Sequence, residues 1–420
     1  MTIREDAGAL APELVQLRHE LHRHPEVGLE LPRTQDRVLA ALDGLPLDIT
    51  TGQGLSSVTA VLRGGARNAG AGAPVAEPLA VLLRGDMDAL PVTEATGAAY
   101  ASGTGDTMHA CGHDLHTAML VGAARLLSAR RESLPGDVVL MFQPGEEGWD
   151  GAGRMIDEGV LDAAGPRVAA GYGLHVTAAG LPRGVVGCRP GPILSASDAL
   201  TVTVRGSGGH GSKPHRAKDP VPVAAEMVTA LQTLVTRQHD IFDPVVLSVG
   251  VLRAGTRRNI IPDTAVLECT VRSYSAAARA RMKDGAVALL RGIASAHGVE
   301  ADIDYHAEYP VTVNDGAQAA FLADTAREVL GEERYVDLPH PVSASEDFSR
   351  VLAAVPGSFA MLGAVPEGAD PERTADNHSP YAVFDDAVLA DGAALLAELA
   401  VRRLGLTADQ RETEEVCADG

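Results

Sequence analysis

The sequence contains few aromatic residues, few cysteines and few positive charges, and each shortage excludes a class of protein. Aromatic residues make up 3% of the 420 positions and apolar residues 45%, so aliphatic side chains must fill the interior, as is typical of α/β enzymes. Four scattered cysteines are too few for a disulfide framework in a chain of this length. The net charge of -21 repels phosphate backbones, which argues against nucleic acid as a partner.

The sequence also contains no long hydrophobic run. No stretch approaches about 18 unbroken apolar residues, so we expect no membrane span. The first ten residues, MTIREDAGAL, carry acidic side chains and lack the apolar segment of a secretory signal. We therefore expect a cytoplasmic protein that has neither a membrane nor nucleic acid as a partner. At about 150 residues per domain, the length predicts two to three domains.

Strand-like and helix-like segments alternate along the first part of the chain. The strand-like runs SSVTAVLR and LAVLLRGD precede a helix-like run, LHTAMLVGAARLLSARR, and the strand-like run DVVLMFQ follows it. Such alternation is typical of a mostly parallel sheet with helices on its faces. We predict an α/β fold with a mostly parallel, mixed sheet flanked by helices.

The pattern changes near residue 195. From there to about residue 309 the order is strand, helix, strand, strand, helix, strand, which is that of a ferredoxin-like βαββαβ unit. We predict an inserted domain over residues 195–309, a discontinuous main domain over residues 1–194 and 310–405, and a disordered tail over residues 406–420.

The sharpest chemical signal is MHACGHDLH, residues 108–116, just before the helix-like run. Gly112 permits an irregular backbone, so that Cys111 and His113 can both enter one site, and a helix N-terminus favours a thiolate. A thiolate, imidazoles and nearby carboxylates suit zinc, or manganese if oxygen ligands dominate. Two other interpretations stay open: a helix cap with incidental histidines, and a thiol nucleophile with a histidine base.

Pairs of carboxylates follow two of the predicted strands. Glu146 and Glu147 come after DVVLMFQ and a Pro-Gly turn, at the strand end where open α/β sheets bind ligands. One carboxylate of such a pair can bind a metal while the other takes a proton from water. Asp86 and Asp88 follow the run LAVLL. We expect Asp88 to orient a ligand histidine by a hydrogen bond, without itself binding the metal. For the glutamates the alternative is solvated surface, and for the aspartates the alternatives are direct binding of the metal and an ordinary Asx turn.

Two isolated histidines complete the set of candidates. His175 lies in a strand-like run after glycine-rich sequence, and His378 lies in the polar turn DNHSP. Each could reach a cleft. Most lone histidines are ordinary surface or core residues, so neither is evidence by itself.

Taken in order, eight motifs resemble the hippurate hydrolase and plant auxin-amino-acid hydrolase branch of the dinuclear aminoacylase/carboxypeptidase superfamily. They are RGDMDALPV, MHACGHDLH, PGEE, GLHV, GGHGSKPH, NIIPD, SEDFS and NHSP, and the resemblance runs from His22 to Asp385. It implies two divalent ions per chain, Mn²⁺ or Zn²⁺, with Co²⁺ or Ni²⁺ as alternatives. It also implies that Cys111 bridges both ions, in the position that an aspartate has in other branches. The remaining ligands it implies are Glu147 and His378 for one ion, and His113 and His175 for the other.

The resemblance also implies roles for residues that are not ligands. Glu146 is the general base that deprotonates the water held by the metal and later passes the proton to the leaving amine. The inserted domain is a lid that closes on the substrate and mediates a homodimer. In this domain His210 stabilises the oxyanion and Asn259 contacts the substrate carboxylate.

The predicted activity is hydrolysis of the amide bond of an N-acyl amino acid or a related small amide. The nearest alternative is a dipeptidase or carboxypeptidase that uses the same site on a peptide. A more distant alternative is a metal-binding protein without turnover, which requires the loss of the base or of a ligand.

Overall fold

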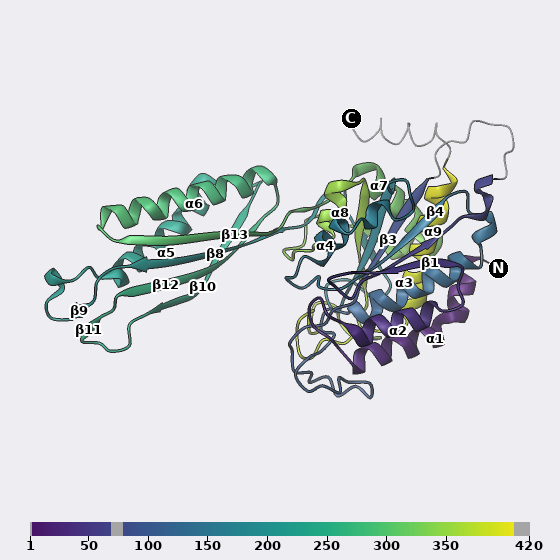
Figure 1. Ribbon diagram of the computed structural model, residues 1–420, viewed down its shortest axis with the longest axis horizontal. Helices are drawn as coiled ribbons and strands as arrows, with labels where there is room; N and C mark the ends of the chain where they lie inside the picture. The colour runs from purple at the N-terminus through teal and green to yellow at the C-terminus, as the bar shows by residue number, and fades with distance from the viewer. Residues whose placement is uncertain (1, 69–78, 407–420) are drawn as a thin grey trace. The chain divides into compact units, whose positions relative to one another are not determined.

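The computed structural model describes residues 2–68 and 79–406 (Figure 1). The predicted tail lies outside the described residues apart from Leu406. The contacts divide the chain into two compact units. The first consists of Met1–Ile193, Val313–His340 and Arg350–Gly420, and the second of Leu194–Thr312 and Pro341–Ser349.

The first unit is built on an eight-stranded mixed sheet with the order β1-β2-β4-β3-β5-β16-β6-β15. In this order the strands are Leu47–Thr51, Val58–Leu62, Asp137–Gln143, Ala80–Asp86, Ala170–Thr177, Gly357–Gly363, Val186–Cys188 and Tyr335–Asp337. Strands β4, β3, β5 and β16 run parallel to their neighbours within this group. Every residue of β3 and β4 is buried, as expected for strands covered on both faces.

Helices flank this sheet. They are α1 (Ile3–Arg23), α2 (Pro32–Leu42), α3 (His113–Ser128), α4 (Gly151–Asp157), α7 (Gly316–Leu330), α8 (Ser349–Ala354) and α9 (Val388–Gly405). Helices α3 and α9 both pack on β3 and β5, whereas α4 packs on β4. The predicted α/β class, with a mostly parallel sheet flanked by helices, is confirmed. No helix among the described residues is long and apolar enough to cross a membrane.

The helix ends follow from local sequence. Thr2 caps α1 in a capping box with Glu5, so that two backbone N–H groups that the helix leaves unpaired gain acceptors. Asp315 caps α7 in a similar way through the backbone N–H of Gln318. These caps set where two of the helices that flank the sheet begin.

The second unit has a four-stranded antiparallel sheet with the order β10-β12-β8-β13. Its elements are β8 (Ala196–Arg205), α5 (Pro220–Gln238), β10 (Val245–Ala254), β12 (Thr264–Ser273), α6 (Ala276–Ala296) and β13 (Glu300–Tyr309). Strand β12 alternates buried and more exposed residues, because only one face of this sheet packs on the helices. The shorter strands β9 (Gly209–His210) and β11 (Ile260–Ile261) also belong to this unit. Strands β7 (Gly191–Leu194) and β14 (Thr312–Asn314) pair with each other and span the residues at which the chain leaves one unit and enters the other.

A later segment, Pro341–Ser349, belongs to the second unit by its contacts. The backbone N–H and the hydroxyl of Ser195 each donate to the carbonyl of Ala344 at 2.9 Å. The hydroxyl of Thr312 donates to the carbonyl of Glu346 at 3.5 Å. Nothing in the periodicity of the sequence predicted this return, because it depends on backbone hydrogen bonds between distant residues.

Three helices meet closely at Gly122 of α3. A Cβ at this position would lie 2.8 Å from the Cβ of Ala393 in α9 and 2.9 Å from a methyl group of Leu14 in α1. Since the Cβ of Ala393 cannot rotate away, the helices could accommodate a larger residue only by moving apart.

We expect Gly122→Ala to destabilise the first unit by about 1–3 kcal/mol because of this overpacking. The matched control is Gly8→Ala, at an exposed position of α1 where an added Cβ meets nothing within 4 Å. This control should stabilise the unit by about 0.5–1 kcal/mol, since alanine is the better helix former. Urea unfolding followed by circular dichroism measures both, and equal midpoints for the two variants would contradict the packing argument.

Candidate metal centre

The candidate residues of the first unit lie where parallel strands end. Asp88 follows β3, Glu146 and Glu147 follow β4, and His175 lies near the end of β5. Carboxyl ends of parallel strands share one edge of a sheet, which is where open α/β sheets bind ligands. His113 reaches the same edge as the first residue of α3.

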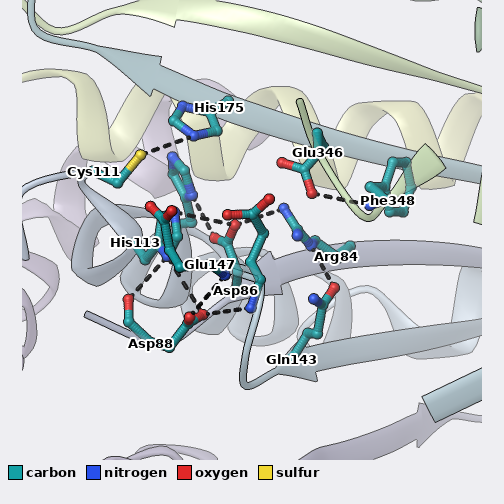
Figure 2. A network of polar contacts seen from close by, with 12 residues as sticks. Arg84, Asp86, Asp88, Cys111, His113, Gln143, Glu147, His175, Glu346 and Phe348 are labelled. Atoms are coloured by element: carbon teal, nitrogen blue, oxygen red, sulfur yellow. Dashed lines mark hydrogen bonds and ion pairs between the residues drawn. The ribbon is translucent and has the colours of Figure 1, made fainter. Parts of the chain in front are cut away.

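The backbone at Gly112 permits the Cys111 and His113 side chains to converge. Gly112 has φ +83°, and a Cβ there would lie 2.4 Å from a methyl group of Val176. Both the left-handed conformation and the close approach therefore require glycine. Figure 2 shows the Cys111 sulfur directed toward His175 and the His113 ring above Asp88.

Hydrogen bonds define which nitrogen of each histidine carries the proton. His113 Nδ1 donates to the backbone carbonyl of Asp88 at 2.9 Å, and His175 Nδ1 donates to the carbonyl of Val176 at 2.7 Å. Each ring therefore turns Nε2, rather than Nδ1, toward the site. His113 Nε2 is buried and makes no hydrogen bond within the part of the chain that the structure describes. This is the arrangement of a histidine that ligates a metal.

Cys111 Sγ lies between two imidazoles from distant parts of the chain. His175 Nε2 is 3.4 Å from the sulfur and His378 Nε2 is 3.3 Å from it. His378 Nε2 also lies 3.1 Å from Glu147 Oε1. The five candidate ligands thus share one cluster, in which potential donor atoms of Cys111, His113 and His175, and of Cys111, Glu147 and His378, lie within 4.8 Å of one another.

The turn that carries His378 is held by its neighbour Asn377. The Asn377 amide donates to the carbonyls of Cys111 at 3.3 Å and Val176 at 3.1 Å, and its oxygen accepts from the N–H of Ala178 at 2.9 Å. The backbone of His378 donates to Ala110 at 2.9 Å, and its φ of +69° is unusual for a residue other than glycine. The sequence analysis gave Asn377 no role, because in the sequence it is one more polar residue of the turn DNHSP.

The Asp88 carboxylate organises the turn of the two glutamates. It accepts from the backbone N–H groups of Glu146 at 2.9 Å and Glu147 at 3.1 Å. It is the backbone carbonyl of Asp88 that holds His113 in the hydrogen bond described above, with the carboxylate 3.6 Å from the same ring nitrogen. The Asp88 side chain therefore holds Glu146, the candidate base, and Glu147, a candidate ligand. Its main-chain carbonyl holds His113, another candidate ligand.

His116, the last histidine of the MHACGHDLH motif, is excluded as a ligand by its hydrogen bonds. Its Nε2 accepts from the N–H of Val176 at 2.7 Å, so its Nδ1 carries the proton and donates to Asp86 at 2.5 Å. Burial lowers the pKa of His116 to about 4 despite the Asp86 carboxylate, consistent with a neutral ring. Neither nitrogen has a lone pair left for a metal.

Three buried polar side chains, Arg18, His22 and Asp114, form a network at the start of α3. Asp114, next to His113, accepts from Arg18 Nε at 2.8 Å and pairs with His22 Nδ1 at 2.7 Å, and all three side chains are buried. Burial opposes the charge of Asp114, but Arg18 and His22 hold the pKa of this carboxyl well below its usual range. The sequence analysis missed this group, although Asp114 lies in the MHACGHDLH motif and His22 is the first residue of the resemblance.

The electrostatics of the cluster favour anionic sulfur. Burial opposes ionisation, but the histidines His175 and His113 hold the pKa of the Cys111 thiol well below its usual range. Burial and the Cys111 thiolate raise the pKa of Glu147, and hydrogen bonds to Cys111 and Glu147 raise that of His378 to about 10. The two acidic groups thus require positive charge beside them. A divalent cation supplies that charge, and imidazole, thiolate and carboxylate donors suit it.

His210 and Asn259 lie in the second unit, where they are close to each other. His210 in β9 pairs with Ile260 in β11, and the N–H of Gly211 donates to the carbonyl of Asn259 at 2.9 Å. The hydroxyl of Ser212 lies 2.9 Å from His210 Nδ1. The structure thus brings the predicted ligands, Glu146 and Asp88 together in the first unit, and His210 and Asn259 together in the second.

The sequence matches the model of peptidase family M20/M25/M40 over residues 82–402. The chain belongs to this family. It is 34% identical to N-acetyl-L-cysteine deacetylase of Bacillus subtilis strain 168 over 96% of this chain and 92% of that protein. It is 36% identical to IAA-amino acid hydrolase ILR1-like 4 of Arabidopsis thaliana over 93% of this chain and 86% of that protein. The predicted superfamily is thereby confirmed, and the protein is a hydrolase.

A solved structure of the M20 family is also similar. The Bacillus subtilis YXEP protein, described as a dinuclear metal binding peptidase, superimposes with a TM-score of 0.77 at 30% identity, over 94% of this chain and 99% of that chain. The fold of this chain is therefore that of an M20 peptidase.

We expect Asp88→Ala to lower metal affinity by about 10- to 100-fold, the usual effect of removing a residue that orients metal ligands. The reason is that Glu146 and Glu147 lose the acceptor of their backbone N–H groups. Equilibrium dialysis against Mn²⁺ or Zn²⁺, followed by elemental analysis, measures the change. Asp106→Ala, in an exposed loop, is the matched control, and equal affinities for the two variants would rule out this role.

Proposed function

We propose that this protein is a metal-dependent amidohydrolase that cleaves the amide bond of an N-acyl amino acid or a related small amide. The observation that carries the proposal is the convergence of Cys111, His113, His175, Glu147 and His378, with Glu146 beside them, at one edge of the sheet. A deacetylase and an amino acid conjugate hydrolase among the relatives support this substrate class.

The ligand set proposed is the one that the motifs predict. Cys111 would be shared by two divalent ions, Mn²⁺ or Zn²⁺ with Co²⁺ or Ni²⁺ as alternatives, with Glu147 and His378 as the other ligands of one ion and His113 and His175 as those of the second. Such ions would supply polarisation of the scissile carbonyl and a lowered pKa of water at the site. The neighbouring thiolate and carboxylate support this set, as does His113 Nε2, which makes no hydrogen bond among the described residues and lies 3.5 Å from Asp86 Oδ2.

Glu146 is the proposed general base. Its backbone is held by Asp88, and the residue is 5% exposed, so it can take a proton from the attacking water in a setting that excludes bulk solvent. The same carboxyl then passes the proton to the nitrogen of the leaving amine. The products are a carboxylic acid and an amino acid.

The second unit has the proposed role of a lid and of a homodimer interface. In this proposal His210 donates to the developing oxyanion, and Asn259 contacts the substrate carboxylate. A cytoplasmic location also belongs to the proposal. Light scattering tests the dimer, for which a mass near twice 43.5 kDa is expected.

Chelation is the direct test of the proposal. EDTA should abolish hydrolysis of N-acetyl and N-benzoyl amino acids, and added Mn²⁺ or Zn²⁺ should restore it. Glu146→Gln should keep its metal content while kcat falls by about 10²- to 10⁴-fold, because the proton acceptor is lost. Glu147→Gln, one position along, is the matched variant, and should lose metal. Full activity in chelator would end the proposal.

The bridging role of Cys111 has a test of its own. We expect Cys111→Asp to keep two ions per chain and measurable activity, since a carboxylate can also bridge, whereas Cys111→Ala should lose at least one ion. Elemental analysis after dialysis measures the stoichiometry. A thiol nucleophile predicts the opposite pattern: both variants inactive, metal content irrelevant, and inhibition by alkylating reagents of enzyme held in chelator.

A dipeptidase or carboxypeptidase activity is the second candidate, supported by the peptidase with a similar fold. A panel of N-acetyl, N-benzoyl and aminoacyl substrates separates a dipeptidase from an N-acyl amino acid hydrolase, because only the dipeptidase should prefer a free amino group beside the scissile bond. Peptides that are blocked at the amino end and carry a free C-terminal carboxylate test for a carboxypeptidase. A metal-binding protein without turnover would hydrolyse no member of the panel.

A further inference from the structure

Strands β3 and β5 are neighbours in the parallel sheet, but their backbone pairing stops before the strands end. Register pairs between them end at Arg84 opposite Gly173, whereas β3 continues to Asp86 and β5 to Thr177. By the same register, Asp86 would lie opposite His175. The ends of both strands therefore need other partners, because buried backbone groups are almost always hydrogen-bonded.

The imidazole of His116 connects these two strand ends. His116 lies in α3, which packs on both strands, and it is only 2% exposed. Its Nδ1 donates to the Asp86 carboxylate at 2.5 Å, and its Nε2 accepts from the N–H of Val176 at 2.7 Å. One edge of the ring is thus bonded to the end of β3 and the opposite edge to the end of β5.

The β3 side of this connection is fixed by close packing. A Cβ on Gly85 would lie 2.8 Å from the carbonyl oxygen of His116, and the Thr117 hydroxyl donates to the carbonyl of Asp86 at 2.8 Å. Asp86 Oδ2 lies 2.7 Å from Arg84 Nη1, and neither side chain is accessible to solvent. The Asp86 carboxylate therefore gives the His116 ring a rigid anchor.

The β5 side of this connection leads to a proposed metal ligand. Val176, whose N–H is bonded to His116, accepts the Nδ1 proton of His175 on its carbonyl at 2.7 Å. The position of Val176 therefore sets the direction in which His175 Nε2 points. His116 thus acts on His175 through the backbone of one intervening residue.

The His116 ring also packs against both histidines assigned to the same ion. Its centroid is 5.3 Å from that of His113 in a stacked arrangement and 4.7 Å from that of His175 in an edge arrangement. The rings of His113 and His175 are themselves 5.8 Å apart and nearly perpendicular, at 83°. The size of the His116 ring thus contributes to the spacing of the two ligand rings.

We infer that His116 is a positioning residue, which holds the ends of β3 and β5 apart and fixes the His175 ring relative to His113. This inference rests on the proposed function and adds a residue to the same site. Of the two proposed ions, only the one assigned to His113 and His175 should depend on His116.

The other proposed ion should not depend on His116, because the turn of His378 has anchors of its own. The Asn377 amide donates to the carbonyl of Cys111, and its oxygen accepts from the N–H of Ala178. The backbone N–H of His378 donates to the carbonyl of Ala110. These bonds remain when the His116 ring is removed, so the two ions should respond differently.

Two amide variants separate the two edges of the ring. The longer side chain of His116→Gln can place its amide oxygen where Nε2 lies and accept from Val176, whereas His116→Asn can reach only Asp86. We expect His116→Asn to lower the affinity for one ion by about 10- to 100-fold, the usual effect of losing an orienting partner, and for the other by less than about threefold. His116→Gln should keep both affinities within about fivefold.

Equilibrium dialysis against graded Co²⁺, followed by elemental analysis, measures both affinities without turnover. Cobalt is the probe because its bond to a thiolate absorbs in the near ultraviolet, which shows whether the retained ion contacts Cys111. His175→Asn, which removes a proposed ligand, identifies the ion that is lost. If His116 acts through His175, the double variant should bind this ion no more weakly than His175→Asn does.

Thr117→Val is the matched control, because it removes the hydroxyl bond from α3 to the Asp86 carbonyl and leaves the His116 ring in place. It should lower the midpoint of thermal unfolding and keep both affinities within about threefold. His116→Phe retains a ring without either hydrogen bond. It should show the same selective loss as His116→Asn, and it replaces that variant if His116→Asn does not fold.

The outcomes separate this inference from the function beneath it. A chain that binds no divalent ion, or that hydrolyses N-acyl amino acids fully in chelator, would remove the proposed function. If two ions bind, but both affinities fall together in His116→Asn and His116→Gln restores neither, the role of His116 is purely structural and the inference alone is overturned. Full additivity of His116→Asn and His175→Asn would also overturn it, since His116 would then not act through His175.

Discussion

The position of one buried sulfur atom organises the candidate centre. Cys111 Sγ lies 3.4 Å from His175 Nε2 and 3.3 Å from His378 Nε2, and His378 in turn contacts Glu147. A thiolate buried in this way requires positive charge around it. Every other feature of the site, from the left-handed Gly112 to the amide of Asn377, serves to bring donors to this atom.

The backbone contributes as much to the site as the side chains. A carbonyl of Asp88 and a carbonyl of Val176 each accept the Nδ1 proton of one histidine, which leaves Nε2 directed into the site. The carboxylate of Asp88 holds the N–H groups of both glutamates. Since these contacts come from elements that are themselves buried, the geometry of the donors is set before any ligand binds.

Buried charge extends beyond the donors. Arg18 and His22 in α1 pair with Asp114 in the first turn of α3, and Asp86 at the end of β3 pairs with His116, two residues further along. Removing one partner of such a pair would leave a buried charge without compensation. These pairs therefore link α1 and the end of β3 to the start of α3, where His113 lies. They account for polar residues that contact neither the proposed ions nor the proposed substrate.

The sequence by itself determined the family, the α/β class and the identity of the candidate donors. These depend on local periodicity and on short motifs at strand ends and helix starts, which the residues specify directly. Only the tertiary structure decided that His116 cannot be a ligand, that Asn377 holds the His378 turn, and that Pro341–Ser349 packs with the second unit. These three results depend on hydrogen bonds and contacts between segments far apart in the chain, which no periodicity or spacing encodes.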